Sequence, residues 1–475
     1  MILGLKPHSA YKLSTCRWLG SLPQHWRELR QRHVAEMRVS NVDKNSEGGE
    51  LPVRLCNYVD VYKNFRITAA INFMRATATQ QEITRFRLRR GDVLITKDSE
   101  TWNDIGVPSL VECEATDLVC GYHLAVLRAH ASVCTGAFLY WASRADNLGY
   151  QYHVEANGVT RYGLSHHAIK SVIIPVPPLD EQCAIVRFLN YADRRIRRYI
   201  AAKKKLTALL NEQKQAIIER AVTRGIDPNV RLKPSGVEWL GDIPEHWKVR
   251  RNGRAFVQRN DVGYPSLPIL EVSLRTGVRI RDFEESNRKQ VMSNPAAYKR
   301  AATGDLAYNM MRMWQGAVGI APCDGLVSPA YVVARCVAGD ARFFVHLFRT
   351  PAYMGQIDQY SRGIVKDRNR LYWEDFKQMP SPSPPPDEQT AIANFIERET
   401  AALSRLCDGL QRQIDVMREI RTRLISDVVT GKLDVREEAA RLPEEIDEAL
   451  ATEEPIEESA DEQTIESAEE EEALA

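Results

Sequence analysis

The residues of this chain that are most suited to chemistry are two groups of Lys and Arg mixed with aromatic residues. The first lies between residues 62 and 97, and the second lies between residues 279 and 312 and again between 362 and 370. Lys and Arg neutralise phosphates, while Arg, amide and apolar side chains recognise the edges of bases. A solvated basic surface is the alternative for either group alone, but two such groups favour nucleic-acid binding.

We expect the base-reading side chains on the loops after two strands that begin with Gly-Asp, at residues 91–92 and 304–305, and on the loops 158–162 and 363–370. Trp102 and Trp314 are equally compatible with positions in a core. The candidates for DNA binding are Lys97, Asp98, Thr101, Trp102, Asn103, Thr160, Arg161, Tyr162, Asn309, Arg312, Trp314, Gln315, Lys366, Arg368 and Arg370.

Motifs for catalysis are missing from the sequence. It contains no GxxxxGK[ST] loop and no GxGxxG after a strand, and residues 294–297 lack the aromatic residue of the adenine methyltransferase signature. No acid-x-Lys triplet of a nuclease follows Asp387 and Glu388. His166 and His167 are adjacent, so on a strand they would point to opposite faces and could not share a metal ion. The sequence therefore predicts a chain that is not an enzyme and holds no metal or cofactor.

The cysteines and the apolar runs indicate a cytoplasmic protein. The chain has nine Cys without a CxxC pair, which is typical of reduced, mostly buried thiols rather than of disulfides or a zinc site. No apolar run approaches the roughly 18 residues of a membrane span, and the N-terminus does not resemble a signal peptide. We expect no membrane contact.

The net charge of +1 conceals two opposite segments. Residues 436–475 contain 17 Asp and Glu against two basic residues, whereas residues 1–435 contain 62 Lys and Arg against 46 Asp and Glu. The terminal segment has no aromatic residue, and its composition predicts disorder. It is either a solvated extension or a segment that screens the basic surfaces by mimicking DNA.

An internal repeat is the most informative feature of the sequence. The stretch WLGSLPQHW from Trp18 to Trp26 returns as WLGDIPEHW from Trp239 to Trp247, and PPLDEQ at 177–182 returns as PPPDEQ at 384–389. His25 and His246 hold equivalent places in the two copies, which favours a structural role over a duplicated catalytic one. Two motifs repeated in the same order indicate two tandem copies of one unit.

Each copy combines a mixed domain with a long helix. Short β-rich runs, at 92–96, 124–127, 171–176 and 330–334, are separated by Gly, Asn and Pro and predict strands and loops. We expect Asp180 and Asp387 to cap the N-termini of the two helices. The predicted plan is a lead-in at 1–17, a first recognition domain at 18–178, a helix at 179–224, a linker at 225–238, a second recognition domain at 239–385, a helix at 386–431 and an acidic disordered tail at 432–475.

The two helices carry the pattern of a coiled coil. Ten positions of the first helix, from 185 to 217 in alternate steps of four and three, contain eight apolar residues, and the ten positions 207 residues further on again contain eight. Two seams of equal length predict helices that bury against each other, although each could instead pack on its own domain. The expected fold is α+β, with two tandem mixed α/β domains joined by two long antiparallel coiled-coil helices as a pseudo-twofold repeat.

Over about residues 15–435 the sequence resembles the specificity subunit of type I restriction-modification systems. The resemblance rests on the W-L-G-x-[IL]-P-x-H-W stretches, the P-P-x-D-E-Q helix starts, and the helix ends A-V-T-R-G and V-V-T-G-K. It implies that each mixed domain reads one half of a bipartite, asymmetric double-stranded DNA target, and that the helices set the gap between the halves. It also implies two adenine-methyltransferase subunits and the restriction subunits as partners, with S-adenosylmethionine, ATP and Mg on those partners.

Two other functions remain open from the sequence. One is a solitary DNA-binding or regulatory protein that uses the same scaffold without methyltransferase partners. The other is a coiled-coil adaptor that binds no DNA. A fused single-chain restriction enzyme would need the methyltransferase and nuclease signatures that the sequence lacks.

Overall fold

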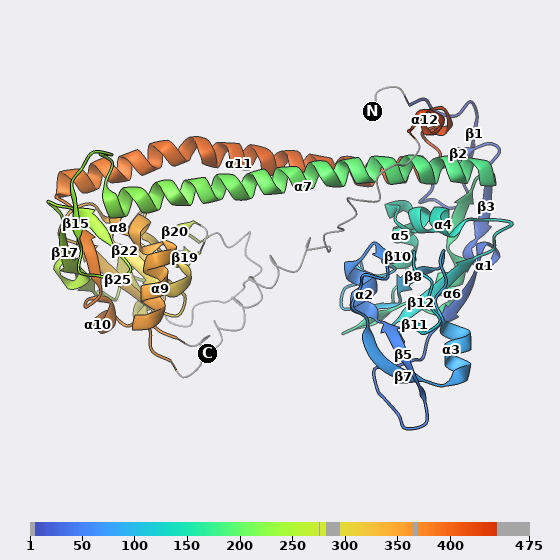
Figure 1. Cartoon of the computed structure of the whole chain (residues 1–475), viewed down its shortest axis with the longest axis horizontal. Helices are drawn as coiled ribbons and strands as arrows, with labels where there is room; N and C mark the ends of the chain where they lie inside the picture. Colours follow the sequence, from blue (N-terminus) through green and yellow to red (C-terminus); the bar gives the residue numbers. More distant parts are fainter. Residues whose placement is uncertain (1–4, 275, 282–294, 364–368, 444–475) are drawn as a thin grey trace. The chain divides into compact units, whose positions relative to one another are not determined.

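The computed structural model describes residues 5–274, 276–281, 295–363 and 369–443. The chain divides into two compact units (Figure 1), which are described separately. Unit 1 comprises Met1–Ala201 and Ile414–Ala475, and unit 2 comprises Ala202–Gln413. Within the described ranges, none of the helices is both long and apolar enough to cross a membrane.

Unit 1 is built on a five-stranded mixed sheet in the order β4-β12-β8-β10-β6 and a three-stranded sheet in the order β11-β5-β7. The strands of these sheets are β4 Ala35–Val39, β5 Leu51–Cys56, β6 Arg66–Ile67, β7 Met74–Ala78, β8 Val93–Thr96, β10 Pro108–Val111, β11 Leu118–Cys120 and β12 Leu124–Ala129. The short helices are α1 Gln31–Val34, α2 Tyr58–Lys63, α3 Gln80–Phe86, α4 Gly136–Ser143, α5 Asp146–His153 and α6 His166–Ser171.

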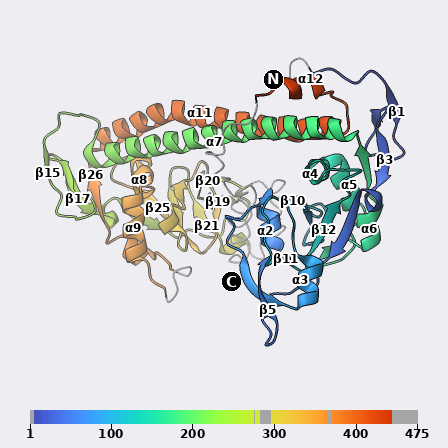
Figure 2. The ribbon, with the colours of Figure 1, turned by 45° about the vertical axis from the view of Figure 1, so that its right-hand side comes forward.

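Strand β12 separates two hydrophobic cores of unit 1. Ala125 and Leu127 belong to the core that contains α4, whereas Leu124 and Val126 belong to the core shared with the three-stranded sheet. All four are buried, because alternate residues of a strand point to opposite faces. Figures 1 and 2 both show α4 and α5 between the sheet and the long helix α7 (Leu179–Arg224) in this unit.

Unit 2 is built on a four-stranded antiparallel sheet in the order β18-β25-β22-β23. Its strands and those of two further two-stranded sheets, β19-β20 and β21-β24, are β18 Phe256–Arg259, β19 Leu270–Ser273, β20 Gly277–Ile280, β21 Lys299–Ala301, β22 Leu306–Asn309, β23 Val318–Ile320, β24 Gly325–Val327 and β25 Tyr331–Cys336. Its short helices are η1 Asn252–Arg254, η2 Pro295–Ala297, η3 Met313–Gln315, α8 Ala341–Phe348, α9 Pro351–Tyr360 and α10 Trp373–Phe376. A cluster of Phe rings from β18, α8 and α10 fills its core.

The sequence repeat is also a structural repeat. In unit 1 the pairs are β1 (Tyr11–Leu13) with β2 (Ser21–Pro23), and β3 (Arg27–Arg30) with β14 (Ile173–Val176). In unit 2 the equivalent pairs are β15 (Leu232–Pro234) with β16 (Asp242–Pro244), and β17 (Lys248–Arg251) with β26 (Pro380–Ser383). All four β-rich runs predicted from the sequence are strands, and the lead-in and the linker each contribute a strand to a unit.

A glutamate at the start of each long helix binds the repeated His-Trp pair, and we call this contact the Glu clamp. In unit 1, His25 Nε2 and Trp26 Nε1 lie 2.8 and 3.0 Å from the two oxygens of Glu181. In unit 2 the equivalent His and Trp contact Glu388 at the same two distances. The predicted structural role of the repeated histidines is confirmed, because each joins a domain to the start of its helix.

We predict that Glu388→Ala destabilises unit 2 by roughly 1–3 kcal/mol, since it leaves the indole N–H of the buried Trp247 without its carboxylate acceptor. Urea denaturation followed by tryptophan fluorescence measures the change. Glu397→Ala is a matched control, because Glu397 forms an exposed pair with Arg342 that contributes about 0–1 kcal/mol. Equal effects of the two variants would contradict a structural role for the clamp.

The two long helices are α7 and α11 (Pro386–Val429), which lie against each other in opposite directions within each unit (Figure 1). In unit 1, Arg421 Nε donates to Asp193 Oδ1 at 2.5 Å, and in unit 2, Lys214 Nζ donates to Ser404 Oγ at 2.8 Å. The predicted antiparallel pairing of two long helices between two mixed α/β domains is confirmed.

Both predicted N-caps are wrong by two residues. The helices begin at Leu179 and Pro386, so Asp180 and Asp387 lie in the first turn. Proline is tolerated there, because its fixed φ suits a helix and the first N–H groups have no partner within the helix. The acidic side chains still lie favourably at the positive end of each helix.

The predicted coiled-coil seam is correct at its ends and shifted in the middle. Tyr199 and Leu206 were expected in the seam but are 39% and 41% exposed, whereas Ile200 is 7% exposed and Thr207 is half-buried. The same shift occurs in α11, where Leu406 is 49% exposed. A straight helix has 3.6 residues per turn, so its buried face drifts by about 20° per heptad relative to a strict seven-residue pattern.

The start of the predicted disordered tail is ordered. Residues 432–443 form a turn and α12 (Arg436–Arg441), and Asp434 N donates to Lys6 O at 2.8 Å. Val435 and Ala439 are buried in the core of unit 1, because apolar residues four apart share one helix face. The prediction of disorder for 432–443 is therefore wrong, and its remainder at 444–475 lies outside the described residues.

All nine cysteines are free thiols. Cys56, Cys120 and Cys134 are buried, Cys183 is exposed, and the other five are partly exposed. The expectation of reduced thiols agrees with this arrangement, but the expectation that most are buried is wrong.

Candidate nucleic-acid interface

A buried carboxylate anchors the Gly-Asp turn that precedes each first candidate loop. Asp92 accepts two hydrogen bonds from Arg128, at 2.7 and 2.6 Å, and Asp305 accepts one from Arg259 at 2.6 Å. Both carboxylates are 2% exposed, and hydrogen bonding to Asp92 raises the pKa of Arg128. The preceding glycine has a φ of +90° in one turn and +87° in the other, a conformation that suits glycine. These ion pairs fix the starts of β8 and β22, which lead into the loops.

In unit 1, the structure brings the two groups of candidates together. Strand β9 (Asp98–Ser99) pairs with β13 (Tyr162–Gly163), so that Tyr162 opposes Ser99. Leu164 N donates to Lys97 O at 2.9 Å. The loop after the Gly-Asp strand and the loop at 158–162 therefore form one surface, although they lie far apart in the sequence.

His123 lies at the centre of this surface and was missed by sequence reasoning. Its Nδ1 is 2.8 Å from Asp98 Oδ2, and its Nε2 is 3.5 Å from an Nη of Arg161. Lys97 Nζ is 3.1 Å from the same Asp98 carboxylate. Lys97, Asp98, His123 and Arg161, which we call the unit 1 cluster, thus place Lys97 and His123 against one carboxylate and Arg161 beside His123.

Exposed aromatic and polar side chains surround the unit 1 cluster. Trp102 is 52% exposed, and Tyr122, whose ring centroid is 3.6 Å from that of His123, is 38% exposed. Burial lowers the pKa of His153, which packs edge-on against Trp102 at 6.2 Å. Thr101, Asn103 and Thr160 are also exposed. Trp102 is therefore available to a ligand rather than part of the core.

In unit 2, the residues of the first candidate loop differ in how far they are exposed to solvent. Asn309 is buried, and its Oδ1 accepts from Met311 N at 2.9 Å, so this side chain stabilises a turn. Trp314 is half-buried against the core and donates from Nε1 to Met311 O at 3.0 Å. Arg312 is half-buried and Gln315 is exposed on η3. Of these four, Arg312 and Gln315 are best placed to reach a ligand.

In unit 2, the described residues that flank the second candidate loop again lie beside the first loop. Leu371 N donates to Met310 O at 2.8 Å, and Arg370 exchanges two backbone hydrogen bonds with Arg362. Arg370 is exposed. Lys366 and Arg368 lie outside the described residues.

The internal repeat is the sequence signal that links the second candidate loops of the two units. Leu164 and Leu371 are separated by the repeat offset of 207, and each joins its own loop to the loop after the Gly-Asp strand. This equivalence could have been found from the repeat. His123 has no motif around it, so only the fold identifies it.

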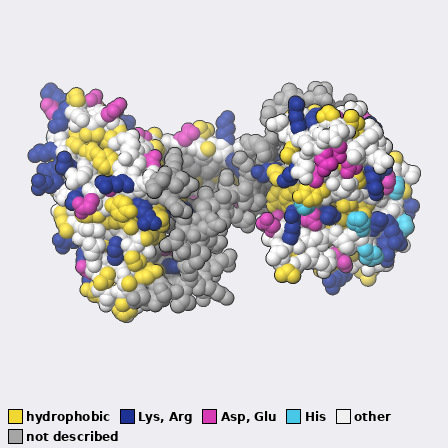
Figure 3. Space-filling model, turned by 90° about the horizontal axis from the view of Figure 1, so that it is seen from below, with side chains coloured by type: hydrophobic (Ala, Val, Ile, Leu, Met, Phe, Trp, Pro, Cys, Tyr) yellow, Lys and Arg dark blue, Asp and Glu magenta, His cyan; other side chains and the backbone are white. Residues whose placement is uncertain are grey.

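Charged side chains of both signs are scattered over the described part of the surface that Figure 3 shows. Figure 3 shows His side chains among Lys and Arg on unit 1, and Lys and Arg among hydrophobic side chains on unit 2. Some of the arginines of unit 2 have acidic neighbours, for example Arg300 with Asp324 and Arg362 with Asp375. Simple counting of basic residues therefore overestimates the number available to bind phosphates.

Comparison with known proteins identifies a family over the first domain and first helix. Residues 56–208 match the family described as the type I restriction modification DNA specificity domain. A protein of Methanocaldococcus jannaschii, assigned as the specificity subunit of the type I restriction enzyme MjaX, is 22% identical over 366 residues. That match covers 75% of this chain and 82% of the relative.

The fold is similar to a solved structure from a study of complex assembly and conformational transition of a type I restriction-modification system. The two chains superpose with a TM-score of 0.62 at 15% identity, over 87% of this chain and 99% of the other. The crystal structure of the HsdS subunit from Thermoanaerobacter tengcongensis matches over 87% of this chain and 98% of the other, with 16% identity and a TM-score of 0.46.

Proposed function

We infer that this chain, which belongs to the specificity-subunit family of type I restriction-modification systems, is the subunit that selects the DNA sequence. The family match lies on residues 56–208, which contain the unit 1 cluster. As a specificity subunit the chain supplies recognition, and the chemistry belongs to its partners.

The observation that carries this function is the duplicated assembly of loops. In each unit, a buried Asp-Arg pair anchors the turn before the first candidate loop. A leucine that follows the second candidate loop, Leu164 in unit 1 and Leu371 in unit 2, donates a backbone hydrogen bond to the first loop. Each unit therefore offers one surface for a short DNA half-site. Two surfaces of different composition support a bipartite and asymmetric target, because each reads its own bases.

We propose that α7 and α11 set the gap between the half-sites. The helices contain 46 and 44 residues, which correspond to roughly 69 and 66 Å at 1.5 Å per residue. When two DNA-binding surfaces are joined by a stiff connection, the second surface adds affinity only if the distance between the two half-sites matches the length of that connection. This argument supports a fixed spacer in the target.

We propose two adenine-methyltransferase subunits and the restriction subunits as partners, assembled in the cytoplasm. S-adenosylmethionine, ATP and Mg would bind to these partners. The two related units support two methyltransferase subunits, one for each copy of the repeat. Isolation of the assembled complex and measurement of its subunit ratio tests this stoichiometry.

We predict that Arg161→Ala and Arg312→Ala each weaken binding of the specific target by about 1–3 kcal/mol if they contact base edges. Each variant should relax the sequence preference of one half-site only. Methylome sequencing of a host carrying the intact system measures the preference, and a filter-binding titration of the assembled complex measures the affinity. Arg17→Ala is a control, because Arg17 packs over Trp18 in the entry segment.

An unchanged affinity and target for Arg161→Ala would remove that residue from the interface. Specific DNA binding by the chain without partners, together with failure to co-purify a methyltransferase, would instead indicate a solitary DNA-binding protein. Failure to bind DNA with or without partners would favour a structural adaptor.

A further inference from the structure

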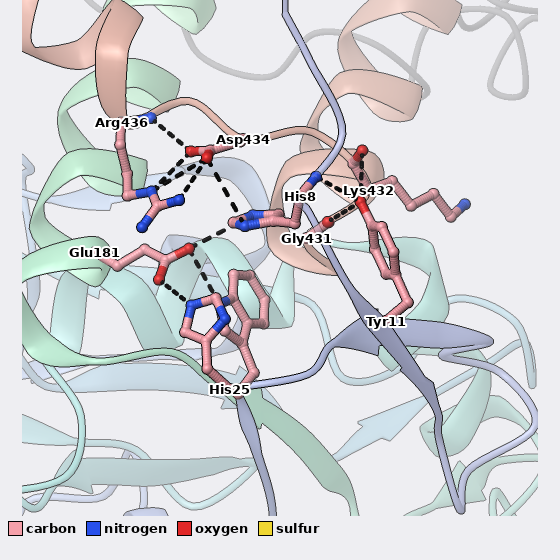
Figure 4. Close-up of polar contacts among 9 residues, drawn as sticks. His8, Tyr11, His25, Glu181, Gly431, Lys432, Asp434 and Arg436 are labelled. Atoms are coloured by element: carbon pink, nitrogen blue, oxygen red, sulfur yellow. Dashed lines mark hydrogen bonds and ion pairs between the residues drawn. The ribbon is translucent and has the colours of Figure 1, made fainter.

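Three residues from distant parts of the chain meet in unit 1, at the start of α7 (Figure 4). His8 comes from the lead-in, His25 from the entry segment and Glu181 from the first turn of the helix. His25 Nε2 is 2.8 Å from Glu181 Oε2, and His8 Nε2 is 3.5 Å from Glu181 Oε1. One ligand atom from each of the three lies within 4.8 Å of the others.

Unit 2 provides an internal comparison for this cluster. It contains the same Glu clamp, with the His246–Glu388 and Trp247–Glu388 contacts at the lengths seen in unit 1. The residue at the repeat offset of 221 from His8 is Asn229. The clamp therefore explains the pairing of His25 with Glu181, but it does not explain a second histidine beside them.

His8 is buried and aimed at this carboxylate. Its side chain is 4% exposed, and its ring nitrogens lie 3.5 Å from Glu181 and 3.8 Å from Asp434, both longer than normal hydrogen bonds. Its backbone N–H donates to the hydroxyl of Tyr11 at 2.9 Å, which fixes the position of the residue. Burial of a polar ring at such distances is costly unless a further partner joins it.

We propose that His8, His25 and Glu181 bind a divalent zinc ion. Two imidazoles and one carboxylate form a ligand set that zinc accepts, with the fourth position open to water. His25 is 44% exposed at its side chain, which gives the ion a path from solvent. The indole N–H of Trp26, 3.0 Å from Glu181 Oε1, orients the carboxylate from outside the ligand set.

The nearby charges leave Glu181 available to a cation. The Arg436 guanidinium, whose pKa is raised first by hydrogen bonding to Asp434 and less by the charge of Glu181, is bound to both oxygens of Asp434 at 2.9 Å from Nε and 2.6 Å from Nη. Asp434 in turn lies 3.8 Å from Nδ1 of His8, on the nitrogen that does not face Glu181. Since residues 8, 25 and 181 lie far apart in the sequence, an ion bound to them would cross-link the lead-in, the entry segment and α7.

The test compares the full-length chain with two variants after removal of metal by a chelator. Titration with zinc chloride in a calorimeter should show one equivalent bound with micromolar or tighter affinity, and zinc should raise the melting temperature. His8→Asn, which installs the residue of unit 2, should weaken zinc binding at least tenfold. His246→Asn, which removes the histidine of the second clamp, should bind zinc as the unmodified chain does.

Urea denaturation in the presence of chelator should give the same midpoint for His8→Asn and the unmodified chain, which shows that the variant folds. A cobalt(II) absorption spectrum provides a second measurement, because tetrahedral coordination gives intense visible bands that His8→Asn should lose. Equal zinc affinity of His8→Asn and the unmodified chain, or the absence of binding to either, would overturn the proposal.

Discussion

Insertion of four residues into both α7 and α11 should lengthen the spacer of the DNA target by about one to two base pairs, with both half-sites unchanged. Four residues extend a helix by about 6 Å and rotate it by about 400°, so the buried faces realign to within roughly 40°. The insertions belong after Ala201 in α7 and after Gln413 in α11, at the boundaries of the two compact units. Methylome sequencing reports the half-sites and the spacer together.

Insertion of two residues at the same places is the matched control. It rotates the following half of each helix by about 200°, so the apolar seam faces solvent and specific methylation should be lost. An unchanged spacer after the four-residue insertions, with methylation retained, would show that the helices do not set the spacing.

Arg128→Ala should lower the free energy of unfolding of unit 1 by about 3–5 kcal/mol, because it leaves the buried Asp92 carboxylate without its cation. Asp92 is 2% exposed and receives two of its hydrogen bonds from Arg128. Since Asp92 holds the turn before β8, the variant should also impair reading of the half-site assigned to unit 1. Urea denaturation gives the stability, and methylome sequencing gives the effect on the target.

Arg54→Ala serves as the control for Arg128→Ala. Arg54 and Asp117 form a two-bond pair of similar geometry, but their side chains are 37% and 46% exposed, so the expected cost is about 0–1 kcal/mol. A similarly small cost for Arg128→Ala would mean that solvent or neighbouring residues compensate the Asp92 charge.

The architecture was predictable because the repeat marks its own boundaries. The WLG and DEQ motifs were recognised as equivalent points, and the Glu clamp now explains why both motifs recur, since Glu181 must reach Trp26 and Glu388 must reach Trp247, across 155 residues in one copy and 141 in the other. The helix ends at Gly225 and Gly431 were also predictable, because their φ values of +75° and +69° suit glycine.

The errors arose where three-dimensional packing overrides a local pattern. The drift of the buried face along a straight helix places Ile200 rather than Tyr199 in the seam. Both side chains are largely apolar, so the sequence pattern alone could not choose between the two positions. The segment after Gly431 was assigned to the acidic tail by its composition, although Val435 and Ala439 complete the core of unit 1.

The candidate site was predicted only to the level of loops. From the sequence, Trp102 and Trp314 were each equally compatible with a DNA contact and with a core position. In the structure Trp102 is exposed, whereas Trp314 packs against a core. His123 could not be found because its role depends on the pairing of β9 with β13. Whether these residues read bases stays a prediction.

The discontinuity of unit 1 has a consequence for biosynthesis. Its core contains Leu424, Ile425, Val428 and Val429 of α11 beside Trp26 and Trp141, whereas unit 2 is one continuous segment. Domains often fold in order from the N-terminus during synthesis. Here the ribosome must complete α11 before unit 1 can close, so unit 2 should reach its native state first. The apolar surface of residues 1–201 then stays exposed until α11 has been synthesised. This surface is where a chaperone would be needed most.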